Sequence, residues 1–294
     1  MALSKEQEKW LSKIMSDNKI VKEVPDELLT EEFLLAAVQK NRNMMQHVPD
    51  AQKSEAVCLA AVKQDGSLLQ HIPKAQKTEA LCLAAVRQDS LNLQYVPEAL
   101  KTEAVYIAAV QKDGQNLRYI PDAAKTEEIC IEAMKHSRSS YINVYSQTVS
   151  SSHPLQLVPE ELKTEAVCLA AVQNDSNALG FVPDAVKTEA VCIAAVQKDG
   201  YRLKYVPDAL KTEAVCLAAV QHGSTDLMRY GLALQYVPDA LKTEALCLAA
   251  VQENGSALQY IPKALITGDF EAKIRSAISS GSGGSGYGVE SIKP

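Results

Sequence analysis

Short apolar runs of seven residues recur along the chain, and polar stretches of nearly constant length separate them. Residues 104–110 read A-V-Y-I-A-A-V, which is apolar on every side of a helix, so we expect a helix buried on several sides. Thr102 and Glu103 precede the run and suit a helix N-terminus, where threonine caps the first turn and an anion favours the dipole. Asp113-Gly114 follows, and we expect Gly114 to end the helix in the left-handed conformation.

A second, shorter helical segment is predicted after the glycine. Leu117, Tyr119 and Ile120 begin it, and Pro121 must break it or start a turn, because proline has no N–H to continue a helix. The chain then returns to the next N-cap, Thr126. One unit is therefore a helical hairpin of 24 residues, which cannot bury a core alone and must stack on its neighbours.

Ten prolines mark the repeat along the chain. They are separated by 24 residues, except for one gap of 38 and one of 31. We expect an all-α solenoid of about ten 24-residue helical-hairpin repeats in two lobes. The prolines are Pro25, Pro49, Pro73, Pro97, Pro121, Pro159, Pro183, Pro207, Pro238 and Pro262.

The two long gaps and the two ends divide the chain into segments. Ser4 and Gln7 fit a capping box, and Trp10, Leu11 and Ile14 are expected to cover one end of the stack. Phe270, Ile274 and Ile278 fall on one helical face and are expected to cover the other. We predict a capping helix (1–24), a first lobe (25–135), an insertion (136–153), a second lobe (154–262) with an insertion near 222–231, a cap (263–278) and a Gly/Ser linker and tail (279–294).

Composition and charge narrow the class of protein. The chain is 47% hydrophobic with a net charge of −6 and an isoelectric point near 5.5. This balance argues against nucleic acid, because a nucleic-acid binder usually presents a basic face. No apolar stretch approaches the length of a membrane span, and the first residues lack the pattern of a signal peptide. We expect a cytoplasmic protein, and a secretion route that uses no signal peptide stays open.

The cysteines occupy one position of the repeat, nine residues after its proline. Leu34 and Tyr106 stand at that position in two other repeats, which indicates packing. No C-x-x-C pair is present, so we predict no metal site and no cofactor, and a reducing compartment. The seven are Cys58, Cys82, Cys130, Cys168, Cys192, Cys216 and Cys247.

Histidines give little sign of catalysis. His47 and His71 stand two residues before a proline, where other repeats have tyrosine, and are expected to be half-buried. A nucleophile pair of Cys130 and His136 is conceivable, but no orienting acid or oxyanion hole stands out. We assign no catalytic residue and predict that the protein is not an enzyme. A cryptic enzyme that uses the 136–153 insertion, with His153, remains an alternative.

Charged and amide residues form columns along the repeats. Glutamates such as Glu103 follow lysines such as Lys101 by two residues, and we expect both to solvate helix ends and neutralise each other. Glutamines three residues before a repeat proline are expected to line an exposed face, and they are Gln46, Gln70, Gln94, Gln156, Gln235 and Gln259. Some helical repeats read RNA with side chains at fixed positions, so an RNA-binding repeat protein is a second alternative.

Specific binding requires residues that vary while the scaffold repeats. Such residues lie in the two insertions and just after an Asp-Gly turn, and Tyr and Arg are enriched at interface hot spots. An equally weighted alternative is that some of them cover an irregular joint in the stack. The partner-binding candidates are Arg138, Tyr141, Tyr145, Tyr201, Arg202, Arg229 and Tyr230.

The repeat L-Q-Y-V-P-x-x-L-K-T-x-x-x-C-L-A-A-V-Q-x-x-G resembles a bacterial tandem-repeat domain of unknown function over about residues 20–262. It is also similar to tetratricopeptide arrays, although it is shorter and lacks their Trp-Leu-Gly signature. Similar repeats occur in effector-like proteins of intracellular bacteria. The resemblance implies a protein-interaction scaffold, either an effector or a regulator of a partner effector, whose partner is another effector or a host protein. It carries over no functional residue.

Overall fold

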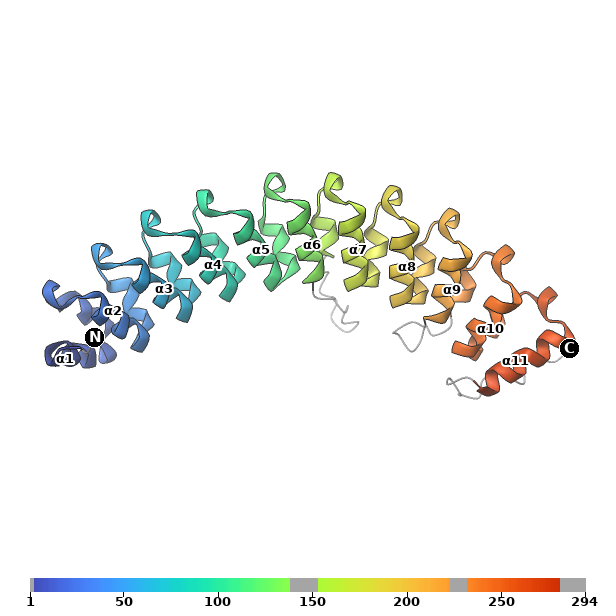
Figure 1. Ribbon diagram of the computed structural model, residues 1–294, viewed down its shortest axis with the longest axis horizontal. Coiled ribbons are helices and arrows are strands. Elements are labelled where there is room, and N and C mark those ends of the chain that lie inside the picture. Colours follow the sequence, from blue (N-terminus) through green and yellow to red (C-terminus); the bar gives the residue numbers. More distant parts are fainter. Residues whose placement is uncertain (1–2, 138–152, 223–231, 281–294) are drawn as a thin grey trace, which may run out of the picture. The chain divides into compact units, whose positions relative to one another are not determined.

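The computed structural model describes residues 3–137, 153–222 and 232–280. Every regular element within those ranges is a helix. None of these helices is long and apolar enough to cross a membrane. The chain divides into two compact units, Met1–Lys125 and Thr126–Pro294. Each unit is a row of stacked helical repeats (Figure 1), which confirms the predicted all-α solenoid class. Most of both insertions, and the tail from residue 281, fall outside the described residues.

The N-terminal unit alternates α-helices with 3₁₀ helices. Its α-helices are α1 Lys5–Ser16, α2 Glu31–Lys40, α3 Glu55–Gln64, α4 Glu79–Gln88 and α5 Glu103–Lys112. Its 3₁₀ helices are η1 Asn18–Glu23, η2 Asp26–Leu28, η3 Arg42–His47, η4 Asp50–Gln52, η5 Gly66–His71, η6 Lys74–Gln76, η7 Ser90–Tyr95, η8 Glu98–Leu100, η9 Gly114–Tyr119 and η10 Asp122–Ala124.

The C-terminal unit repeats the same alternation. Its α-helices are α6 Glu127–Lys135, α7 Glu165–Asn174, α8 Glu189–Lys198, α9 Glu213–Gln221, α10 Glu244–Glu253 and α11 Gly268–Ser280. Its described 3₁₀ helices are η11 Pro154–Leu157, η12 Glu160–Leu162, η13 Ser176–Phe181, η14 Asp184–Val186, η15 Gly200–Tyr205, η16 Asp208–Leu210, η18 Leu232–Tyr236, η19 Asp239–Leu241, η20 Gly255–Tyr260 and η21 Lys263–Leu265.

One repeat contains three helical segments: the two expected helices, and a 3₁₀ turn at the proline, where the sequence left open a break or a turn. The α-helix and a six-residue 3₁₀ helix were expected in outline, and the segment after the proline is a three-residue 3₁₀ turn. In η10 the proline supplies the carbonyl that closes this turn, with Ala124 N donating to Pro121 O at 2.9 Å. A residue without an N–H can still accept a hydrogen bond, so proline starts this turn without loss.

The six-residue segments are 3₁₀ helices because their apolar residues recur every third position. In η9 and its C-cap, Gly114, Leu117 and Ile120 are buried, and side chains three apart lie over one another in a 3₁₀ helix. Asp113 begins the segment, since its carboxylate accepts a hydrogen bond from Gln115 N at 2.9 Å. The aspartate therefore starts the second segment as well as ending the α-helix.

The predicted left-handed glycine after the α-helix is wrong. Gly114 is the first residue of η9, and neither Gly66 nor Gly200, its equivalents, has a positive φ. Space explains the glycine instead. A Cβ at Gly200 would lie 2.0 Å from Ala219 O and 2.4 Å from His222 O. Glycine thus lets this segment approach the C-terminal end of the next α-helix.

Each helix N-cap also ties one repeat to the preceding one. Thr188 Oγ1 accepts a hydrogen bond from Val191 N at 3.3 Å and donates one to Glu165 Oε1, in the preceding helix, at 2.6 Å. Thr102 is the N-cap of α5, as predicted, and donates to Glu79 Oε1 at 2.6 Å, but its side chain accepts no cap hydrogen bond from α5. The glutamate column therefore accepts hydroxyl protons from the next repeat.

The expected mutual neutralisation of the lysine and glutamate columns is wrong. Most of these lysines pair with the acid three residues earlier, as in Lys53 Nζ–Asp50 Oδ1 at 2.6 Å. Lys77 follows Lys74 instead, and its Nζ donates to Tyr95 O at 2.7 Å. Lys53 Nζ also donates to His71 O at 2.8 Å, and its side chain is buried. Because the glutamates already accept from threonine, the two columns have different partners.

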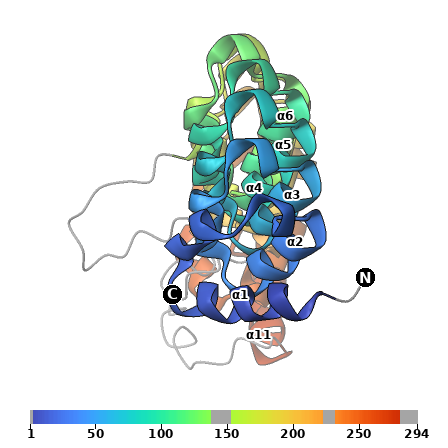
Figure 2. The ribbon, with the colours of Figure 1, turned by 90° about the vertical axis from the view of Figure 1, so that its left-hand side faces the viewer.

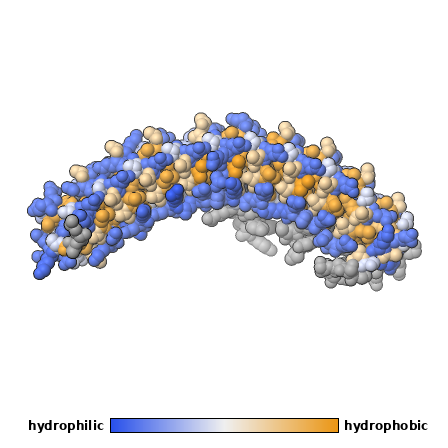
Figure 3. Space-filling view, in the orientation of Figure 1, coloured by the Kyte–Doolittle hydropathy of each residue, from blue (hydrophilic) through white to orange (hydrophobic). Residues whose placement is uncertain are grey.

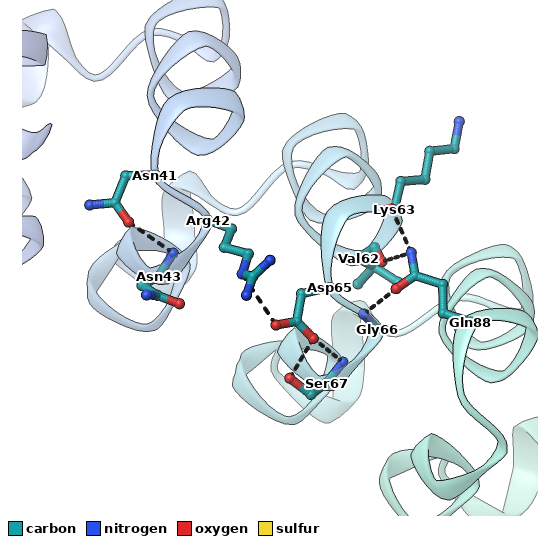
Figure 4. Close-up of polar contacts among 9 residues, drawn as sticks. All are labelled: Asn41, Arg42, Asn43, Val62, Lys63, Asp65, Gly66, Ser67 and Gln88. Atoms are coloured by element: carbon teal, nitrogen blue, oxygen red, sulfur yellow. Dashed lines mark hydrogen bonds and ion pairs between the residues drawn. The ribbon is translucent and has the colours of Figure 1, made fainter.

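Amide side chains close the C-terminal ends of helices across the repeat boundary (Figure 4). Gln88 Nε2 donates to Val62 O at 2.7 Å and to Lys63 O at 2.5 Å, while its Oε1 accepts from Gly66 N at 2.7 Å. One side chain therefore satisfies backbone groups at the end of α3 that have no intrahelical partner. Nearby, Arg42 Nε lies 3.3 Å from Asp65 Oδ2, which links a third repeat to the pair.

The core of each unit is built from one side of its α-helices. In α8 the buried residues are Val191, Cys192, Ala195 and Val196, and the same positions are buried in the other repeat helices. We expected these helices to be buried on several sides, and this is wrong for the side that faces away from the core. That side is also apolar, but Ala190 on it is exposed. The glutamine column is exposed as predicted, apart from the half-buried Gln235.

Helices at the two ends cover the stacks. Ser4 and Gln7 form the predicted capping box of α1, and Leu11 and Ile14 are buried. Figure 2 views the N-terminal unit from α1, with α2 and α3 behind it. At the other end, Phe270 and Ile274 of α11 are fully buried, whereas Ile278 is only half-buried.

Candidate functional site

The predicted partner-binding residues divide into two groups. Five of them, Arg138, Tyr141, Tyr145, Arg229 and Tyr230, lie outside the described residues, and their role stays a prediction. Tyr201 and Arg202 lie in η15 of the C-terminal unit, so the site can be built from this segment.

The backbone of η15 is held at its start and against the next repeat. Asp199 Oδ1 accepts a hydrogen bond from Tyr201 N at 3.1 Å. Gly200 N donates to His222 O at 3.0 Å, at the end of α9. These contacts fix the start of a short helix whose side chains differ from those of most repeats.

Aromatic and basic side chains gather where η15 meets η18. The rings of Tyr201 and Tyr236 meet edge to face, with centroids 5.5 Å apart. Lys204 Nζ lies 4.3 Å from the Tyr201 ring centroid and 4.5 Å from that of Tyr205, within the range of cation–π attraction. Tyr205 is 40% exposed. We call Tyr201, Lys204, Tyr205 and Tyr236 the tyrosine–lysine cluster.

Arg202 is less exposed than the cluster, although its guanidinium carbon lies 5.9 Å from the Tyr201 ring centroid. Its role as a contact residue stays a prediction. Its side chain is buried, and its Nε and Nη2 lie 2.9 and 2.7 Å from Asp199 Oδ2. The Asp199 side chain is only 4% exposed. Because the guanidinium is committed to a buried carboxylate, Arg202 supports η15 from within and offers little surface to a partner.

Three members of the cluster were not predicted from the sequence, although their positions carried a signal. Lys204 replaces the glutamine of the exposed column, and Tyr205 and Tyr236 belong to the tyrosine position before Val-Pro. The equivalent positions also meet elsewhere in this unit, although stacked instead of edge to face: the rings of His153 and Phe181 have centroids 5.8 Å apart. The residue five positions before the proline-preceding valine thus meets the aromatic residue of the next repeat.

The cysteine position is a packing position, as predicted. All seven side chains are buried, and burial raises the pKa of Cys58, Cys168, Cys192 and Cys216 to about 11. A thiol with a raised pKa is a weak nucleophile at neutral pH. Within the described ranges, no group of three or more His, Cys, Asp and Glu side chains is placed to hold a metal ion.

The histidines lie in three different environments. His47 and His71 are half-buried, as predicted, and burial is the main cause that lowers the pKa of each. His136 is exposed with Nε2 3.6 Å from Glu132 Oε2, while Cys130 is fully buried. His153 is buried, its Nδ1 accepts from Leu155 N at 3.1 Å, and burial lowers its pKa.

Parts of both units match a known family model. The model, described as a domain of unknown function (DUF4116), matches residues 55–101, 78–123 and 217–266. The first two matched segments each contain two successive repeat helices, and the third contains the end of α9 and all of α10. Together the matches cover less than half of the chain. No curated protein and no solved structure matches the chain. The comparisons agree with a helical repeat domain and name no activity.

Proposed function

We propose that this protein is a non-catalytic scaffold that binds a protein partner through the tyrosine–lysine cluster of its C-terminal unit. The observation that carries the proposal is the stacking of Lys204 over the rings of Tyr201 and Tyr205 on a partly exposed surface. Tyrosine is among the residues enriched at interface hot spots. The surrounding repeats keep one framework, and this segment varies within it.

The framework supports binding because it holds the cluster rigidly. The start of η15 is fixed by hydrogen bonds, and Arg202 braces it from the core side. Side chains fixed on regular elements lose little conformational entropy when a partner binds. We expect the five candidates in the two insertions to extend this surface.

The biological setting is a further part of the proposal. The resemblance to repeats of effector-like bacterial proteins favours an effector, or a regulator that acts on one. The partner is then another effector or a host protein. The site of action is the cytoplasm, or a host cell reached by a route without a signal peptide.

RNA binding is the second candidate, because aromatic side chains recur at one position per repeat. Tyr119, Phe181 and Tyr205 are all at least 39% exposed, and aromatic rings can stack on unpaired bases. The lysines of the repeat argue against it. Lys187 and Lys211 each pair with an aspartate three residues earlier, which leaves few cations to neutralise phosphates.

The test is affinity capture with mass spectrometry from bacterial and host lysates, with and without nuclease. The tyrosine–lysine cluster is changed to alanine in one variant, and Tyr119→Ala, at the same repeat position in the other unit, is the control. We expect one stoichiometric protein partner that the control keeps and the cluster variant loses. A variant with alanine at Arg138, Tyr141, Tyr145, Arg229 and Tyr230 tests the insertions.

Other outcomes would reject the scaffold proposal. A nuclease-sensitive capture would favour RNA. Capture of no partner, or of a partner that both variants keep, would remove the cluster as a binding site. Circular dichroism of each variant confirms that the helices remain folded.

A further inference from the structure

The α-helices of the C-terminal unit carry an apolar surface on the side away from the core. In α8, Ala190 is exposed and Ile193 and Ala194 are half-exposed. A helix that is apolar on all sides is usually buried on all sides. Figure 3 shows hydrophobic residues in a band along this face of the α-helices, with hydrophilic residues at its edges.

The same three positions are apolar in four consecutive helices, α7 to α10. They lie seven, ten and eleven residues after each proline and read Ala, Leu or Ile, and Ala. The larger side chain lies near the middle of each helix; it is 37% exposed at Leu217 and half-buried in the other three helices. We call this surface the outer α face, and its four larger residues are Leu169, Ile193, Leu217 and Leu248.

Charged residues mark both ends of the outer α face. At the equivalent positions α6 has Glu128 and Glu132, and α11 has Asp269 and Lys273. These substitutions show that the fold tolerates charge at these positions. The middle position stays apolar even there, as Ile131 and Ala272, so only the two alanine positions are shown to accept charge. Exposed apolar patches mark interaction sites.

The two long edges of the face differ in charge. One edge carries a glutamate from the first turn of each helix, such as Glu189 and Glu213, and both are exposed. The opposite edge carries a glutamine near the end of each helix, such as Gln197 and Gln221. A complementary ligand is therefore apolar in the middle and basic along one side. The net charge of −6 disfavours a second copy of this chain.

We propose that the outer α face of the C-terminal unit binds an amphipathic α-helix of a protein partner, with lysine or arginine along the edge that meets the glutamates. The inference rests on the proposed function and specifies the chemistry of the partner. Packed helices lie about 8–10 Å apart, close to the rise of about 10.8 Å over two helical turns. A partner helix that crosses α7 to α10 therefore presents the same face to each of them, and about 20 residues of it span the four repeat helices.

The N-terminal unit provides an internal control. Its helices α3 to α5 carry the same apolar positions, but Lys63 and Arg87 stand where the C-terminal unit has glutamine. Both are exposed. A basic helix is repelled by these side chains, so we expect it to prefer the C-terminal unit.

The experiment titrates the full chain into a fluorescent helix-forming peptide of about 21 residues, with leucines on one face and lysines along one flank. The test variant is Ala194→Glu with Ala218→Glu, which places at α8 and α9 the residue that α6 has at this position. The control variant is Ala60→Glu with Ala84→Glu in the N-terminal unit. We expect the test variant to weaken binding by about tenfold or more, since it buries two carboxylates, and the control to bind as the original chain does.

Three results would overturn the inference: equal binding of a scrambled peptide, equal loss in both variants, or a dimer that the test variant dissociates in light scattering. A dimer of this kind would mean that the outer α face binds a second copy of this chain. The alanine variant of the tyrosine–lysine cluster separates this test from that of the proposed function. If it loses a captured protein while the peptide fails to bind the original chain, the scaffold stands and the helix-binding face does not.

Discussion

The space next to the following repeat determines where glycine is required in this protein. Gly66 and Gly200 have ordinary backbone conformations, but an added Cβ would meet backbone or side-chain atoms of the following repeat. Gly180 differs, since a Cβ added there would have no neighbouring atom within 4 Å. The two kinds of glycine therefore respond to substitution in opposite directions.

We predict that Gly200→Ala lowers the free energy of unfolding by about 1–3 kcal/mol, because the methyl group overlaps two carbonyl oxygens of the next repeat. Gly180→Ala is the matched control and is expected to raise it by about 0.5–1 kcal/mol, through the lower entropy of the unfolded chain. Urea unfolding followed by circular dichroism measures both. Equal destabilisation by the two substitutions would show that close approach does not select the glycine.

The buried pair of Asp199 and Arg202 gives a second prediction at this scale. Arg202→Met leaves a carboxylate in a buried site, and we expect it to cost about 3–5 kcal/mol of unfolding free energy. Adding Asp199→Asn should restore most of the loss, because Met44 and Asn41 occupy these positions in another repeat. The comparison of single and double variants by urea unfolding tests this. A double variant as unstable as Arg202→Met would contradict it.

The candidate site was only partly predictable because the direction of each side chain depends on the type of helix. Tyr201 and Arg202 were chosen for their side-chain type and for their position just after an Asp-Gly turn, and neither shows which way a side chain points. In the 3₁₀ helix η15 the buried residues are Gly200, Arg202 and Leu203. The Arg202 side chain therefore points inward, whereas Lys204 contacts the rings of Tyr201 and Tyr205. The contact between the rings of Tyr201 and Tyr236 joins two successive repeats, so it becomes visible only when the repeats are stacked.

At the scale of the element, caps and turn closures were more visible in the sequence than helix type. Threonine, aspartate and proline mark the three starts of each repeat, and each acts locally. The α-helices and the capping box of α1 were predicted for this reason. The 3₁₀ segments were not, because an L-x-x-V spacing over six residues also fits one face of an α-helix.

The hydrogen bonds of each N-cap hydroxyl are expected to contribute to the stability of the helix that it begins. Thr188→Ala removes both the cap to Val191 and the bond to Glu165, and we expect a loss of about 1–2 kcal/mol. Thr188→Ser should keep both bonds, since Ser54 makes them in α3. Thr102→Ala should cost less than Thr188→Ala, because the Thr102 hydroxyl accepts no cap bond. The urea midpoints of the three variants measure these losses. If Thr188→Ala is not the least stable of the three, Thr188 does not act as the assigned N-cap.

At the scale of the whole molecule, repetition multiplies small effects. Each repeat contributes one N-cap and, in most cases, one lysine–acid pair and one buried thiol, and its stability depends on its nearest neighbours. The repeat count and stacking could be predicted because the prolines recur at fixed spacing. The outer α face could not, since a helix that is apolar on all sides gives no sign of which side is uncovered.

The buried thiols predict a loss of stability at alkaline pH. In the unfolded chain a thiol ionises near its ordinary pKa of 9.0, whereas in the folded chain Cys58, Cys168, Cys192 and Cys216 have a pKa of about 11. Burying neutral thiols therefore stabilises the fold fully below about pH 9, and this contribution is lost as the pH rises toward about 11. We therefore expect the urea midpoint to fall as the pH rises from about 9 toward about 11.

A variant without three of these thiols separates their effect from that of other groups. Cys168→Val, Cys192→Val and Cys216→Val keep an apolar side chain at a position where Leu34 already replaces cysteine. The fall in midpoint should be smaller in this variant, because three groups that ionise only on unfolding are gone. An unchanged fall would assign the alkaline loss to the lysines or tyrosines. A smaller fall would mean that the repeated cysteine position, which carries no chemistry in any single repeat, sets the pH limit of the whole stack.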